Sequence, residues 1–155
     1  MRHQLRRTKM TPLTKVYEAF LAKITDDEYL HWTKEEINAD LRKILEAAIP
    51  SFKFPRVDLT IEGDNFIGDL KAEEIKIISS YMREEWLNRC ILDTENLRPL
   101  YDERDFSPAN FIDKLHSLLK TEQATARKAE SDYYRSVNRK PFDYGKLAGG
   151  NNGSH

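Results

Sequence analysis

Residues 105–135 constrain the fold most, because they begin with strong helix signals and lose their large apolar residues halfway along. Ser107 is a suitable N-cap, Pro108 follows where a helix tolerates proline best, and Phe106 and Phe111 have the spacing of a hydrophobic staple. The next apolar residues have the spacing of a buried helical stripe: Phe111, Ile112, Leu115, Leu118 and Leu119. We therefore expect one long helix whose first half, residues 111–119, holds the subunit together.

The second half of this helix has no comparable stripe. In residues 121–132 the only apolar side chains are those of Ala124, Ala126 and Ala129, although these residues still favour helix. One interpretation is a solvated helical extension, and the other is a segment that packs between subunits. The second predicts that residues 121–135 reach a neighbouring subunit, and it makes three residues candidates for interaction: Tyr133, Tyr134 and Arg135.

Three further helical segments are expected before residue 93. Thr11 and Pro12 resemble a cap followed by proline, and they predict a helix over residues 12–24 with this apolar face: Leu13, Val16, Phe20 and Leu21. After a short helical turn near residues 25–32, Thr33 and Glu36 form a capping box. The helix that it begins is ended by Pro50. Residues 70–92 have an apolar face wide enough to pack against several helices, and residues 93–104 are expected to be a polar connection.

Residues 56–69 predict a β-hairpin. Val57, Leu59 and Ile61 alternate with polar residues, and residues 63–65 supply turn chemistry before a second short strand. A lone hairpin is marginal in water. It must therefore pack on the helices of its own chain or extend the sheet of a neighbour.

These patterns predict a mainly α fold: a small helical bundle with one long helix, a small β-hairpin insertion and extended termini. Residues 1–10 would be an N-terminal arm, residues 11–136 the helical domain, and residues 137–155 an extended tail. The arm is basic, and Met10 is an alternative start; its candidate phosphate or partner contacts are Arg2, Arg6, Arg7 and Lys9. The tail is expected to be a mobile end or to anchor in a neighbour through Phe142 and Tyr144.

Composition narrows the functional classes. The formal net charge of −1 gives no overall basic field for nucleic acid, and the single Cys90 excludes an internal disulfide framework. No apolar run approaches the roughly 18 residues of a membrane span, and no secretory signal is visible. These features predict a soluble intracellular protein from a reducing compartment, with no membrane partner.

The sequence also offers little for catalysis. Asp113 and His116 have a spacing that can share a metal ion, but one such pair has too few ligands for a stable site. The adjacent carboxylates at residues 35–36 and 84–85 point about 100° apart on a helix, so neither pair is poised for shared acid–base chemistry. Nucleophile and phosphate-binding motifs are absent from the sequence. We expect no enzymatic activity, no cofactor and no metal.

Two stretches resemble a known class of protein. The segments EEIKIISSYMREEWLNRCI and DERDFSPANFIDKLHSLLKTEQATARKAESDYYR are similar to small head–tail connector proteins of tailed bacteriophages, also called neck, adaptor or head-completion proteins. The resemblance covers about residues 10–147, and its motifs encode structure rather than chemistry. The residues that carry it are Met82, Trp86, Asp105, Phe106, Ala109, Asn110, Tyr133, Tyr134 and Arg135.

The resemblance implies a structural virion protein. Such a protein would form a homo-oligomeric ring, of twelve copies in the usual case, that links the portal and head to tail and neck proteins. DNA would pass through the ring without sequence-specific binding. The chain would be made in the cytoplasm of the bacterial host and end in the neck of the virion. The basic ends leave open a DNA-packaging or DNA-binding accessory protein, and an interaction module without a DNA role is a third possibility.

Overall fold

The computed structural model describes residues 9–25, 27–97 and 108–138. These residues form α1 (Leu13–Leu21), α2 (Lys34–Ala48), α3 (Ala72–Leu97) and α4 (Pro108–Asn138), with 3-10 helices at Asp27–His31 and Ile49–Ser51. A three-stranded antiparallel sheet joins β1 (Thr11–Pro12), β2 (Ile61–Glu62) and β3 (Asn65–Phe66) in the order β1-β3-β2. The predicted mainly α bundle with one long helix and a small hairpin is therefore confirmed.

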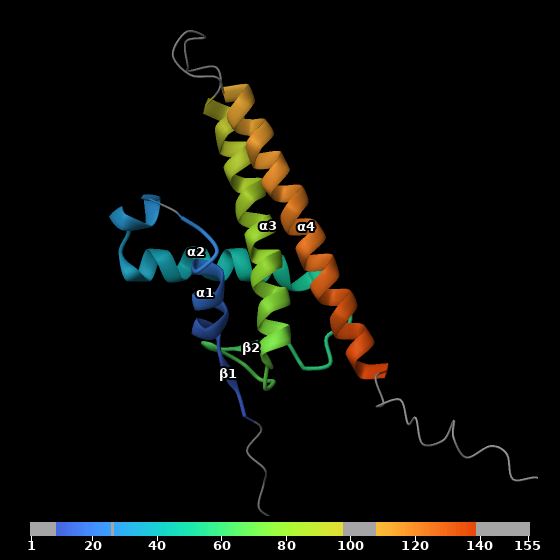
Figure 1. The fold of residues 1–155 in the computed structure, drawn as a ribbon. Helices are drawn as coiled ribbons and strands as arrows, with labels where there is room; N and C mark the ends of the chain where they lie inside the picture. The colour runs from blue at the N-terminus through green and yellow to red at the C-terminus, as the bar shows by residue number, and fades with distance from the viewer. Residues whose placement is uncertain (1–8, 26, 98–107, 139–155) are drawn as a thin grey trace, which may run out of the picture.

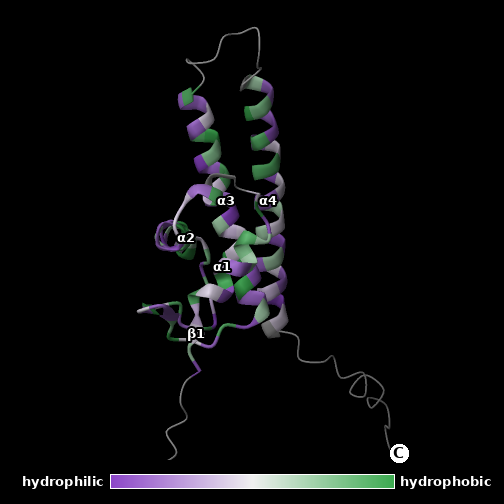
Figure 2. Ribbon diagram, turned by 90° about the vertical axis from the view of Figure 1, so that its left-hand side faces the viewer, coloured by the Kyte–Doolittle hydropathy of each residue, from purple (hydrophilic) through white to green (hydrophobic). Residues whose placement is uncertain are grey.

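The two longest helices, α3 and α4, run antiparallel as a hairpin (Figure 1). α1 and α2 pack against α3 as far along as Arg89, and α2 crosses it. The part of the hairpin where α3 ends and α4 begins extends beyond α1 and α2 in both views (Figures 1 and 2). The described chain thus has a multilayered body and a projecting two-helix arm.

The hairpin is shorter than the sequence predicted. The sheet also contains a third strand, β1, which the sequence did not predict. The hairpin is confined to residues 61–66, and Gly63 supplies the positive φ of 61° that its turn requires. Thr11 pairs with Phe66 rather than capping a helix. Its hydroxyl donates to the Gly68 carbonyl (2.9 Å) and accepts from the Leu70 amide (2.8 Å). The hairpin therefore packs on its own chain, as one of the two alternatives predicted.

Gly68 allows the chain near Asp58 to approach closely. A Cβ atom at position 68 would lie 2.6 Å from the carbonyl oxygen of Asp58 and 3.1 Å from its amide nitrogen. Because both atoms belong to the backbone, no side chain can rotate away. We expect Gly68→Ala to lower the free energy of unfolding by about 1–3 kcal/mol, measured by urea denaturation. Gly63→Asn is the control, because asparagine tolerates a positive φ and the space around Gly63 is open. Equal stability of both variants and the parent chain would contradict this reasoning.

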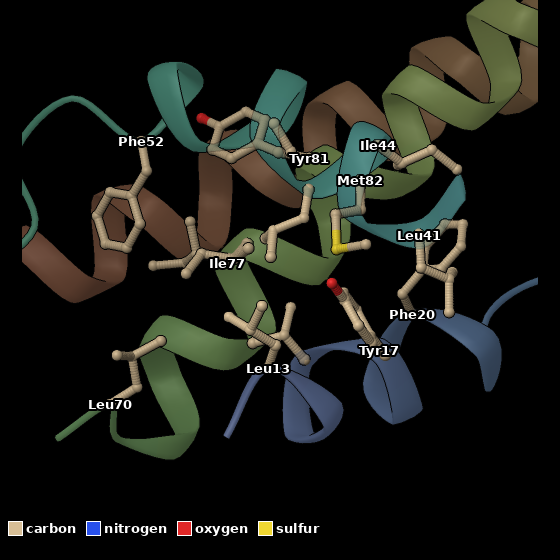
Figure 3. Packing of buried hydrophobic residues seen from close by; sticks show 14 of the residues in the cluster. Leu13, Tyr17, Phe20, Leu41, Ile44, Phe52, Leu70, Ile77, Tyr81 and Met82 are labelled. Carbon is tan, nitrogen blue, oxygen red and sulfur yellow. The ribbon is translucent and has the colours of Figure 1, made fainter. Parts of the chain in front are cut away.

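The main core lies where the helices of the body meet the sheet. Figure 3 shows Leu13, Tyr17 and Phe20 of α1 facing Ile77 and Met82 of α3, with residues of α2 closing the far side. The other buried residues of this cluster are Val16, Leu41, Ile44, Leu45, Ala48, Phe52, Phe66, Leu70, Ile78, Tyr81, Ala126 and Tyr133. The projecting arm has a much smaller core of its own, made by Leu87, Ile91 and Leu115.

Helix boundaries agree with the sequence where local signals set them. Thr33 and Glu36 form the predicted capping box, with hydrogen bonds of 2.8 and 3.2 Å. α4 begins at Pro108 as expected, whereas the predicted cap Ser107 and staple residue Phe106 lie outside the described residues. Two boundaries were wrong. α1 ends at Leu21 rather than residue 24, with Leu21 exposed, and α3 continues to Leu97 through residues predicted to be a connection.

Candidate interaction surfaces

The second half of α4 packs on its own chain, and Tyr133, a candidate interaction residue from the sequence, is buried there. This side chain is only 2% exposed. Its ring meets the ring of Phe52 edge to face at 5.3 Å, and the guanidinium of Arg56 lies 3.8 Å from its centroid. The Arg56 amide donates to the Tyr133 hydroxyl (2.8 Å), and the Arg56 guanidinium donates to the Tyr133 carbonyl (3.2 Å). Tyr133 thus fixes the segment after α2 to the end of α4.

Tyr134 belongs to a second intramolecular network. The hydroxyls of Tyr134 and Tyr81 donate to the two carboxylate oxygens of Glu130, at 2.6 and 2.7 Å. Burial and the hydrogen bond to Glu130 raise the pKa of Tyr134 to about 12, and the same causes raise the pKa of Tyr81. Both hydroxyls therefore stay protonated near neutral pH and keep donating. The Tyr134 hydroxyl also accepts from the Phe54 amide (3.2 Å), so this residue is engaged within the chain.

The structure describes only two of the remaining candidate interaction residues. Arg135 and Lys9 are exposed. Lys9 lies near Asp69, whose carboxyl pKa is lowered first by the hydrogen bond from Lys71 (2.8 Å) and further by the positive charge of Lys9. The other candidate residues lie outside the described residues: Arg2, Arg6, Arg7, Phe142 and Tyr144.

A charged cluster around the buried Glu122 lies between the body core and the core of the arm, near Trp86, which packs against both cores. Arg83 donates to Glu122 at 2.6 Å, and the Glu122 side chain is only 5% exposed. The Nε of Arg83 and the second carboxylate oxygen of Glu122 are buried without a hydrogen-bond partner among the described residues. Burial, and then the charge of Glu122, raise the pKa of Glu84. Burial lowers the pKa of Lys23, which donates to the Ser80 hydroxyl (2.8 Å). No local sequence pattern predicts the contact between Arg83 and Glu122, because the two residues lie 39 positions apart in the chain.

Tyr29, Asp40 and Arg89 form another polar cluster, which ties the first 3-10 helix and α2 to α3. Tyr29 donates to one carboxylate oxygen of Asp40 (2.6 Å) and Arg89 donates to the other (2.7 Å). Burial and the hydrogen bond to Asp40 raise the pKa of Tyr29 well above its usual value. Because both oxygens of Asp40 are engaged by its own chain, the arrangement is structural rather than poised for acid–base chemistry.

The projecting arm exposes large apolar side chains that its small core does not cover. Leu92 and Leu97 on α3 are 57% and 44% exposed, and Phe111 and Leu118 on α4 are 43% and 38% exposed. The sequence placed Phe111 and Leu118 in a buried stripe, but only Ile112 and Leu115 of that stripe are buried, with Leu119 partly so. Figure 2 shows hydrophobic residues along both helices at this end. This surface is a candidate for contact with another protein, although Leu30 and Phe54 of the body are more exposed, at 79% and 70%.

The described residues contain no cluster of side chains suited to bind a metal ion and no helix suited to span a membrane. In residues 9–25, 27–97 and 108–138, no group of three or more histidine, cysteine, aspartate or glutamate side chains could hold a metal ion. None of the helices within those ranges is both long and apolar enough to span a bilayer. Comparison of the chain with protein-family models, curated proteins and solved structures gave no match.

Proposed function

We propose that this chain is a structural subunit of a phage neck, a ring-forming adaptor that links the portal and head to the tail around the DNA channel. The observation that carries the proposal is the projecting α3–α4 arm, on which Leu92, Leu97 and Leu118 are substantially exposed. A contiguous patch of exposed apolar side chains commonly marks a protein–protein contact. The resemblance of residues 10–147 to connector proteins supplies the class of assembly.

The body of the subunit supports the same role. Its helices are fixed to one another by buried side chains and by polar networks such as Tyr29–Asp40–Arg89. The arm, by contrast, has a small core of Leu87, Ile91 and Leu115, and Ile112 is also buried there. A rigid body with a thinly supported arm is suited to a subunit that completes its packing by assembly, and it needs no cofactor or catalytic group.

Reconstitution with portal protein tests the proposal. The purified chain is mixed with portal assemblies and with a tail or neck fraction, and complexes are separated by sedimentation and imaged by electron microscopy. We expect a ring of this chain to co-sediment with the portal. A chain that associates with neither portal nor tail components would refute the neck role. In a parallel gel-shift assay, salt-sensitive binding to DNA without binding to portal would favour the DNA-accessory alternative.

A further inference from the structure

A groove lies on the outer face of the small sheet, beside the start of the described chain. Phe66 of β3 is buried in the main core, so the next residue, Ile67, points to the opposite face of the sheet. Ile67, Val57 and Met10 line the groove, and Met10 is 42% exposed. The groove has a volume of about 860 Å³, which is in the range of clefts that hold small ligands. The sheet face therefore has an apolar floor that is open to an occupant.

The rim of this groove is acidic. It carries the carboxylates of Asp58, Glu62 and Asp69, and a single ammonium group, that of Lys71. Lys71 donates to Asp69 (2.8 Å), whereas Asp58 accepts from the Thr60 amide (2.8 Å), a bond that favours the charged carboxylate. In the part of the chain that the structure describes, neither Asp58 nor Glu62 forms an ion pair. The rim thus keeps two carboxylates that lack a cation.

The basic N-terminal arm is attached at the edge of this groove. Met10 directly precedes β1 and lines the groove, so Lys9 is held beside it. The pKa of Asp69 is lowered first by the hydrogen bond from Lys71 and further by the charge of Lys9, which places Lys9 near the acidic rim. The sequence before it, MRHQLRRT, contains three arginines, one leucine and no acid. The N-terminal arm therefore offers guanidinium groups for the rim, and its leucine and apolar arginine stems for the floor.

We propose that residues 1–8 dock in this groove on their own chain, with their arginines at the acidic rim. The occupant is the chain's own N-terminal arm because it is tethered at Met10, inside the groove. A short tether keeps the local concentration of a segment at roughly millimolar, which favours this arm over a basic segment of another molecule. A docked arm is withheld from phosphate, so the groove competes with DNA for the same arginines. The inference goes beyond the neck role and does not depend on portal protein.

Trypsin cleavage within the N-terminal arm tests the docking. The groove variant removes the three negative charges of the rim and keeps the size of each side chain: Asp58→Asn, Glu62→Gln and Asp69→Asn. Asp58→Asn still leaves an oxygen to accept from the Thr60 amide, so the fold should be retained. At low salt, we expect this variant to be cut after Arg6 and Arg7 about fivefold faster or more than the parent chain. Mass spectrometry of the full chain over time measures the rate.

A second triple variant controls for the change in net charge. Its substitutions are at exposed positions of the projecting arm, away from the sheet: Asp93→Asn, Glu95→Gln and Asp113→Asn. This control variant should be cut as slowly as the parent chain. Cleavage of the parent chain should also be unchanged on dilution, because the docking is within one chain. Faster cleavage on dilution would show that the N-terminal arm occupies the groove of another copy and would overturn the inference, as would equal cleavage of all three chains.

DNA binding provides a second measurement. The two triple variants have the same net charge, so a difference between them reports on release of the N-terminal arm. We expect the groove variant to bind a short DNA duplex at low salt about threefold or more tightly than the control variant. Equal binding by the two variants would overturn the inference. If both measurements come out as expected and the parent chain fails to bind portal, the docking is supported and the neck role is removed.

Discussion

Tyr133→Ala is expected to lower the free energy of unfolding by about 3–5 kcal/mol, as for other large aromatic residues removed from a core. The ring is 2% exposed and packs against Phe52 and the guanidinium of Arg56. Its loss leaves a cavity between α4 and the segment after α2. It also leaves the Arg56 amide without the hydroxyl that accepts its hydrogen bond. Urea denaturation followed by circular dichroism measures the change.

Two matched variants separate packing from hydrogen bonding at this position. Tyr133→Phe keeps the ring and removes only the hydroxyl, so it should cost about 1 kcal/mol. Arg135→Ala removes an exposed side chain from the same turn of α4 and should change stability by less than about 0.5 kcal/mol. If Tyr133 served a neighbouring subunit instead, Tyr133→Ala would weaken association and leave the unfolding of the isolated chain unchanged. That outcome would support the sequence prediction for this residue.

The burial of Tyr133 illustrates which parts of the fold the sequence could predict. The capping box at Thr33 and the start of α4 at Pro108 depend on residues within one helical turn, so local patterns were sufficient. The contacts of Tyr133 join residues 77 positions apart in the sequence. No periodic pattern carries that information, because two adjacent tyrosines after a polar stretch suit either a core or an interface.

The sequence pattern did not predict which side chains of α4 are buried, in either half of the helix. Ala126 is fully buried, and its small side chain lets α4 approach α3 closely, yet alanines among charged residues look like a solvated face. Phe111 and Leu118 have helical spacing, but spacing does not say how many partner helices are available to cover the stripe. Among the described residues, α3 is the only helix that packs against that end of α4, so a single narrow seam is buried. The exposed remainder is what makes the arm a candidate for assembly.

The buried pair Arg83–Glu122 gives the second large prediction. Glu122→Ala is expected to lower the free energy of unfolding by about 3–5 kcal/mol, because the Arg83 guanidinium would be left partly buried without its carboxylate. Replacing both partners, with Arg83→Met and Glu122→Leu, should recover most of that loss, since the double variant removes the desolvated charges together. The double variant would also remove the two buried atoms of the pair that lack a hydrogen-bond partner, Nε of Arg83 and Oε1 of Glu122. Thermal and urea denaturation of the single and double variants provide the measurement.

An exposed ion pair on the same helix provides the control for this experiment. Lys128 and Asp132 lie 3.2 Å apart, with side chains 80% and 55% exposed. Asp132→Ala should therefore change stability by less than about 1 kcal/mol. A Glu122→Ala variant no less stable than Asp132→Ala would show that the charged cluster between the two cores is hydrated. If the double variant instead remained as unstable as Glu122→Ala, the missing interaction would be packing between α3 and α4 rather than charge. Either result would locate the weakest point between the body and the arm, because this pair joins the helices where the main core ends and the small core of the arm begins.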